Sequence, residues 1–120
     1  MKALRTPEKV VQAQIVKLLK QVGARVYVLG TRRAKGDHQG TRQTPGVPDV
    51  IAFVPRKYGP PGDPQDEWTH LYIEVKADGG RMRAEQLEFA RYCGLAHVRH
   101  IVGGLDPVIA VLVEHGRLKE

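Results

Sequence analysis

The stretch LYIEVKA, residues 71–77, places a carboxylate and an amine where they could act together. Apolar and polar residues alternate in it, as is typical of a β-strand, so Glu74 and Lys76 share one face of that strand. A carboxylate can hold a cation there, and an amine can orient water or balance developing negative charge. The alternative is a solvated strand face, on which an exposed Glu–Lys pair contributes little to stability.

A second carboxylate, Asp49, stands between the turn residues TPGVP and the apolar run VIAFV. Its strand is expected to be the neighbour of the strand that carries Glu74, and neighbouring strands lie about 5 Å apart. Both carboxylates could then reach one cation, and two carboxylates, a strand carbonyl and water are ligands that suit Mg²⁺. The alternative is that Asp49 is an ordinary turn residue.

Glu8 stands near the start of an expected helix over residues 6–23, three residues before its apolar stripe. The stripe recurs at helical spacing and consists of Val11, Ile15, Leu18 and Val22. Glu8 continues this stripe inward, although the helix dipole alone also favours a glutamate in the first turn. Thr6 can cap the helix, Pro7 fits its first position and Gly23 follows its end.

Gln86 lies on a second expected helix, within residues 79–94, which is expected to end at Gly94. The other members of its helical row are apolar or small, namely Met82, Phe89 and Cys93. A glutamine that faces a core normally needs hydrogen-bond partners. Gln86 therefore either serves the polar cluster or ties down backbone.

The hydrophobic pattern predicts the elements that must position these residues. The expected strands cover residues 24–29, 47–55, 71–77 and 97–103. The second is expected to end at Pro55, with a loop over residues 56–69, and a closing helix over residues 106–116 is expected to have Asp106 as cap and Pro107 at its first position. The order α-β-β-β-α-β-α predicts an α/β protein. Its mixed four-stranded sheet, flanked by helices, would have three antiparallel strands and a fourth parallel to the third.

Composition favours a polyanionic partner, because the net charge is +6 and the isoelectric point is about 9.7. A length of 120 residues suits one domain, residues 1–120. The single cysteine, Cys93, is expected in the core, and no apolar run approaches the roughly 20 residues of a membrane span. The first residues lack the apolar segment of a secretion signal, so an intracellular protein is expected. Trp68 is expected to pack, with stacking on a base as the alternative.

Candidate phosphate contacts are basic residues in two segments. They are Arg32, Arg33, Lys35 and Arg42 in the Gly-rich loop 30–46, and Arg81 and Arg83 after the turn DGG. At the second segment the start of a helix would also offer backbone N–H groups to a phosphate. Each of these charges alone could be an ordinary solvated one, but their clustering beside the proposed site favours phosphate contacts for the group.

The motifs GVPDV, IEVK and RAEQLEF, in this order, resemble the PD-(D/E)XK nuclease superfamily and most closely its VRR-NUC family. The opening PEKVVQAQIVKLLKQVGARVYVL also looks like that family's first helix and strand. The similarity runs from about Thr6 to Val113. It implies a VRR-NUC-like nuclease domain with the PD-(D/E)XK restriction-endonuclease-like core.

The resemblance implies a role for each matching residue. Asp49, Glu74 and the carbonyl of Val75 would hold Mg²⁺, for which Mn²⁺ would substitute. Lys76 would be the catalytic lysine, and Glu8 would assist at the metal or orient its water. Gln86 would support Lys76 or touch DNA.

The expected activity is therefore metal-dependent hydrolysis of phosphodiester bonds in DNA. By resemblance, the enzyme would be a homodimeric endonuclease specific for branched DNA, such as four-way junctions or flaps. It would act in the cytoplasm of a bacterium or of a phage's host. Two alternatives remain: a non-catalytic DNA-binding or assembly module that retains the fold, and a structural protein whose charges are ordinary surface pairs.

Overall fold

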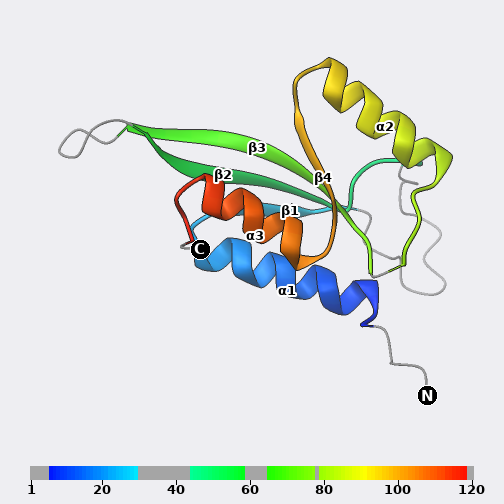
Figure 1. The fold of residues 1–120 in the computed structure, drawn as a ribbon, viewed down its shortest axis with the longest axis horizontal. Helices are drawn as coiled ribbons and strands as arrows, with labels where there is room; N and C mark the ends of the chain where they lie inside the picture. The colour runs from blue at the N-terminus through cyan, green and yellow to red at the C-terminus, as the bar shows by residue number, and fades with distance from the viewer. Residues whose placement is uncertain (1–5, 30–43, 59–64, 78, 119–120) are drawn as a thin grey trace, which may run out of the picture.

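The computed structural model describes residues 6–29, 44–58, 65–77 and 79–118. Within these ranges the elements are α1 (Glu8–Gln21), β1 (Arg25–Val28), β2 (Val50–Tyr58), β3 (Gln65–Val75), α2 (Ala84–Leu95), β4 (Arg99–Gly103) and α3 (Leu105–Glu114) (Figure 1). This order is the one expected from the sequence. None of the described helices is long and apolar enough to cross a membrane.

The four strands form one mixed sheet in the order β1-β2-β3-β4. β1 and β3 both pair antiparallel with β2, whereas β4 pairs parallel with β3. The predicted α/β class and the mixed four-stranded sheet are therefore confirmed. The register places Val50, at the start of β2, opposite Ile73, near the end of β3, so these two strand ends meet.

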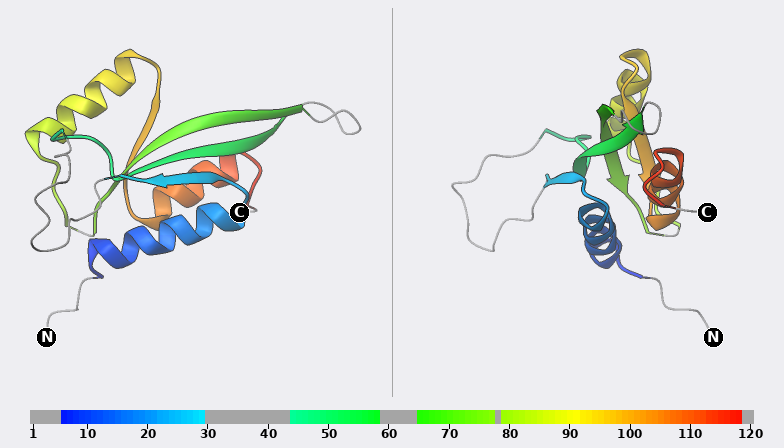
Figure 2. Two further views of the ribbon diagram at one scale, coloured as in Figure 1. Left: turned by 180° about the vertical axis from the view of Figure 1, so that it is seen from behind. Right: turned by 90° about the vertical axis from the view of Figure 1, so that its left-hand side faces the viewer.

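The core lies between one face of the sheet and the helices α1 and α3. Both helices lie on this face, whereas α2 lies beside the beginning of β4 (Figures 1 and 2). The inward residues of β2 and β3 follow the period of 2 that a half-covered strand requires. The fully or almost fully buried apolar side chains of the sheet are Val50, Ala52, Val54, Leu71, Ile73 and Val75.

α1 contributes a stripe that differs from the expected one by one position. Ile15 and Leu19 are completely buried, whereas Leu18 and Val22 are only partly buried. The inward line, Val11, Ile15 and Leu19, follows a spacing of four residues. The expected N-terminus is also wrong by one position, since Pro7 is the N-cap in extended conformation and Thr6 makes no cap hydrogen bond. Gly23 follows the end of the helix with a positive φ of 89°, as expected.

α2 packs on the opposite face of the sheet through Phe89. The ring of Phe89 lies 5.5 Å from that of Tyr72 and 5.8 Å from that of His100, between centroids. The expected end of α2 at Gly94 is wrong: the helix continues to Leu95, and His97 adopts the left-handed conformation with φ 59°. Histidine tolerates this region better than most residues.

Two further expected boundaries differ from the structure. β2 does not end at Pro55 but continues to Tyr58, and β3 begins at Gln65, so much of the expected loop 56–69 is strand. Pro55 is tolerated because β1 pairs only with Val50–Phe53, which leaves β2 at an edge beyond that point. Similarly, α3 begins at Leu105 with Gly104 as its N-cap, so Asp106 and Pro107 lie inside its first turn.

The burial on α1 predicts a sharp difference between adjacent leucines. We expect Leu19→Ala to lower the free energy of unfolding by about 2–5 kcal/mol, because it leaves a cavity under the sheet. Leu18→Ala should cost clearly less, since Leu18 remains partly in solvent. Urea unfolding of both variants tests this, and equal losses would contradict the described orientation of α1.

Candidate active site at the ends of β2 and β3

Asp49 lies directly before β2 and is tied to both neighbouring strands. Its backbone carbonyl accepts a hydrogen bond of 2.7 Å from the N–H of Leu29, just beyond β1. Its side-chain Oδ2 accepts one of 2.8 Å from the N–H of Val75 at the end of β3. Asp49 is therefore more than a turn residue, because its carboxylate is aimed across the sheet at the strand that carries Glu74.

The backbone of Val75 faces the same place. In an extended strand the N–H and the C=O of one residue point to the same edge. Since the N–H of Val75 points to Asp49, its carbonyl also points to the side on which Asp49 lies. This orientation fits the expectation that the Val75 carbonyl could join the two carboxylates around a cation.

Glu74 is the most unusual side chain of the site because it is only 2% exposed. Its Oε1 is buried without a hydrogen-bond partner among the described residues. Burial, and then a hydrogen bond with Asp49 and the charges of Asp49 and Glu8, raise the pKa of Glu74 to about 8, while the charge of Lys76 lowers it. Two carboxyl groups can share a hydrogen bond only when one of them holds a proton. At neutral pH the pair therefore retains a proton unless a cation takes its place.

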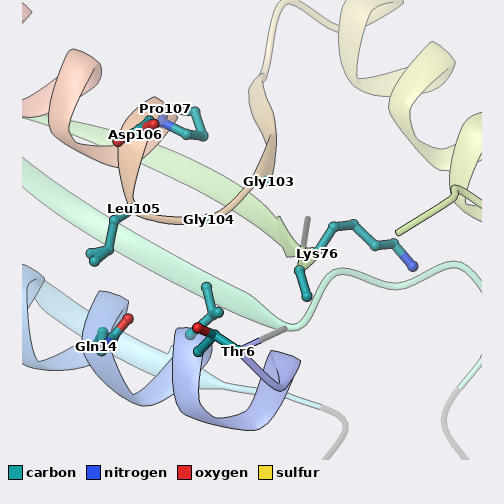
Figure 3. Close-up of a pocket in the computed structure, with 10 residues that line it drawn as sticks. Thr6, Gln14, Lys76, Gly103, Gly104, Leu105, Asp106 and Pro107 are labelled. Carbon is teal, nitrogen blue, oxygen red and sulfur yellow. The ribbon is translucent and has the colours of Figure 1, made fainter. Parts of the chain in front are cut away.

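Lys76 follows β3 and is held by a hydrogen bond of 3.0 Å from its N–H to the carbonyl of Gly103 on β4. Figure 3 shows its side chain extended toward the segment that precedes α2. A methyl group on Gly80 would lie 3.3 Å from Cδ of Lys76, so the 79–83 segment passes close to the lysine stem. Arg81 and Arg83 are exposed on this segment, which brings them to the neighbourhood of the site.

Glu8 and Gln86 reach the site from the two helices in different ways. Glu8 is the first residue of α1 and is exposed, yet its charge acts on Glu74. Gln86 caps α2: its Oε1 accepts a hydrogen bond of 2.8 Å from the N–H of Arg83. Gln86 therefore ties down backbone, which is one of its two expected roles. A role beside Lys76 stays a prediction. Of the other candidate phosphate contacts, Arg32, Arg33, Lys35 and Arg42 lie outside the described residues.

The residues present fit a divalent cation. A buried carboxyl oxygen of Glu74 without a partner, the carboxyl group of Asp49 beside it, and the adjacent Val75 carbonyl form an oxygen-rich set of the kind that Mg²⁺ prefers. The part of the chain that the structure describes holds no group of three or more His, Cys, Asp or Glu side chains suited to a metal. Water would therefore have to complete the coordination, as it usually does for Mg²⁺.

A hollow of about 360 Å³ lies beside this site and not at it. It is lined by the start of α1, by Lys76 and Ala77, and by the turn from β4 into α3 (Figure 3). The amine of Lys76 points away from it, toward α2. Asp49 and Glu74 do not line the hollow, so the candidate site lies outside it.

One positioning residue could be recognised only in part from the sequence. Gly46 was expected in a tight turn, and it has a positive φ of 95°. The structure adds that a Cβ at this position would overlap the backbone carbonyl of Glu85 in the first turn of α2. Gly46 thus fixes the distance between α2 and the segment that carries Asp49. No local sequence signal could reveal this contact, because it joins residues far apart in the chain.

The chain matches no protein-family model, no curated protein and no solved structure. The family resemblance of its motifs therefore stays a prediction, and the candidate site is supported by its geometry alone.

The raised pKa of Glu74 predicts a pH-dependent stability. Between about pH 5 and 8 the folded protein keeps a proton that the unfolded chain releases, so the free energy of unfolding should fall as pH rises through this window. In EDTA we expect the free energy of unfolding to fall by a few kcal/mol across this pH window. Glu74→Gln, which keeps a neutral group in place, should abolish most of the loss. Urea unfolding at several pH values measures it.

Glu88→Gln is the matched control for this prediction, because Glu88 is exposed on α2. It should retain the wild-type slope of stability against pH. If Glu74→Gln retained that slope as well, Glu74 would not be the group that holds the proton.

The contact of Gly46 with α2 predicts a specific cost of substitution. We expect Gly46→Ala to destabilise the protein by more than the roughly 1–3 kcal/mol of backbone strain alone, since the new methyl group also displaces α2. Gly23→Ala is the matched control: its φ is 89°, but no atom lies within 4 Å of the added Cβ. Thermal unfolding compares the two variants. Equal losses of stability would show that the contact with Glu85 adds nothing to the cost of the substitution.

Proposed function

We propose that this protein is a metal-dependent endonuclease that hydrolyses phosphodiester bonds in DNA. The observation that carries the proposal is the convergence of Asp49, Glu74 and Lys76 where β2 begins and β3 ends. Two carboxylates and a lysine at one point suit the transfer of a phosphoryl group, in which negative charge develops and water must be oriented.

Asp49, Glu74 and the Val75 carbonyl would hold Mg²⁺, and Mn²⁺ would substitute for it. When bound, such a cation supplies Lewis-acid stabilisation of charge on the phosphoryl oxygens. The hydrogen bond from the Val75 N–H keeps one oxygen of Asp49 in place, and burial keeps Glu74 fixed and dry. Both contacts reduce the reorganisation that the site needs when the substrate binds.

Lys76 would orient water or balance the charge on the phosphate, and Glu8 would add a further acidic group at the edge of the site. Gln86 would act through the start of α2, which it caps, and so through Arg83 and Arg81. These arginines are exposed on the segment beside Lys76 and would contact the flanking phosphates.

At the finer level, we propose a PD-(D/E)XK restriction-endonuclease-like core of the VRR-NUC type. The observed α-β-β-β-α-β-α order and the meander with a parallel fourth strand support it. From the same resemblance we propose branched DNA, such as four-way junctions or flaps, as the substrate and a homodimer as the active form. A dimer would supply the two active sites that symmetric cleavage of a junction needs.

Cleavage of labelled DNA tests the proposal. Wild type should cut four-way junction, flap, single-stranded or duplex DNA with Mg²⁺ or Mn²⁺ and should not cut in EDTA. Lys76→Ala should slow cutting by about 10²–10⁴-fold while DNA binding persists, because the lysine acts on the reacting groups. Asp49→Asn and Glu74→Gln should not cut with Mg²⁺ or with Mn²⁺.

Lys17→Ala is the matched control, because Lys17 is an exposed lysine on α1. It should cut at the wild-type rate. Tight DNA binding without cutting under any metal would replace the enzyme by the non-catalytic binding module. If the Asp49, Glu74 and Lys76 variants all kept the wild-type activity on DNA, only the third alternative would remain, a structural protein whose charges are ordinary surface pairs.

A further inference from the structure

The face of the sheet opposite α1 and α3 carries a row of aromatic rings on three adjacent strands. Tyr27 on β1 lies 6.0 Å from Phe53 on β2, and Phe53 lies 6.5 Å from His70 on β3, between ring centroids. Tyr27 is 55% and Phe53 40% exposed. Large rings in water at neighbouring positions of a sheet are unusual, because burial is what normally stabilises such residues.

α2 covers only one end of this face. Beyond His70 the row continues to Tyr72, whose ring packs against Phe89 of α2. None of the described helices covers the part formed by β1, β2 and the preceding residues of β3, where Tyr27 and Phe53 are exposed (Figure 2). We call this part, Tyr27, Phe53 and His70, the open aromatic face.

A cationic hollow borders the open aromatic face. It measures about 650 Å³ and lies between Trp68 and the turn from α1 into β1, with Lys20, Arg25 and Tyr27 in its lining. Trp68 is 50% exposed there. Neither Lys20 nor Arg25 forms an ion pair with an acidic side chain among those that the structure describes, which do not include Asp66 and Glu67. One hollow therefore offers flat apolar surfaces and two positive charges together.

The combination of exposed rings and positive charges favours a strand of nucleic acid over a second copy of the chain as the occupant. A protein interface over this face would remove Lys20 and Arg25 from water without a described partner, which is costly. A single strand of nucleic acid offers bases that stack on rings and phosphates that pair with the cations. The net charge of +6 acts in the same direction.

The open aromatic face lies on the same side of β3 as the candidate active site, with Tyr72, packed against Phe89 of α2, between them. Trp68, His70, Tyr72 and Glu74 alternate along β3 and share one face of it. Trp68 and Glu74 are six residues apart, which in a strand is about 20 Å. A strand of nucleic acid only a few nucleotides long would reach from one to the other.

We propose that the open aromatic face and Trp68 bind unpaired bases of a single-stranded nucleic acid segment, with Lys20 and Arg25 on its phosphates. The inference rests on the proposed function, which it deepens: the preferred substrate contains a single-stranded part beside the bond that is cut. The bases stack on the rings without sequence preference, because every base has a flat face.

Trp68 is the only tryptophan of the chain, so its fluorescence reports directly on this surface. We expect oligodeoxythymidine to quench it in EDTA, where no cutting occurs, and duplex DNA to quench it far less. Tyr27→Ala and Phe53→Ala should each weaken the binding of oligodeoxythymidine about 5- to 100-fold. Lys20→Gln and Arg25→Gln should each reduce the slope of log affinity against log salt by about 0.7.

Tyr92→Ala is the matched control, because Tyr92 on α2 is 56% exposed, close to the 55% of Tyr27 on β1, but lies outside the open aromatic face. It should bind oligodeoxythymidine as wild type does. Tyr27→Leu and Phe53→Leu keep an apolar side chain without a ring, so they separate loss of stacking from loss of folding, which circular dichroism monitors. Weak binding in the folded leucine variants supports the proposal.

Three results would overturn the inference. They are an absence of quenching, equal binding by the Tyr27, Phe53 and Tyr92 variants, and sedimentation of a dimer in which Trp68 is shielded from acrylamide. The proposed function fails separately: cutting without quenching refutes only the aromatic site. Quenching without cutting under any metal supports the aromatic site and refutes the nuclease.

Discussion

The hydrogen bond between the Val75 N–H and the Asp49 carboxylate is the contact on which the candidate site depends. It joins the beginning of β2 to the end of β3 at a point where the regular pairing of these strands has already finished. The carboxylate of Asp49 thereby replaces a backbone acceptor, and the same contact sets it beside Glu74. A charged acceptor makes such a bond stronger than a neutral one. The strand pairing and the acidic pair are therefore secured by one interaction.

The acidic pair carries a stability cost that the rest of the sheet must offset. A buried carboxyl group without a full set of partners is destabilising in its charged form, and Glu74 is nearly inaccessible to water. The apolar side chains of α1, α3 and the inner sheet face stabilise the strands from the other side. One face of the sheet thus supplies stability, while the other holds the groups that could do chemistry and the exposed rings.

Much of this arrangement could be predicted from the sequence, because it follows from local patterns. The alternation in LYIEVKA places Glu74 and Lys76 on one face, and the order of elements makes the strand of Asp49 its neighbour. What could not be predicted depends on contacts between distant residues. The contact between Gly46 and Glu85 and the buried oxygen of Glu74 are examples. Element boundaries failed where pairing overrides a local signal, as at Pro55.

The hairpin of β2 and β3 extends well beyond its neighbours. β1 pairs with Val50–Phe53 and β4 with Leu71–Val75, so the outer part of the hairpin is two-stranded among the described residues. Free strand edges invite further strands, and they are a common origin of aggregation. On the β2 edge Pro55 has no N–H, and its carbonyl accepts a hydrogen bond of 2.9 Å from Nε of Arg117. A residue that is unusual in a strand therefore protects this arm from adding a strand of another molecule.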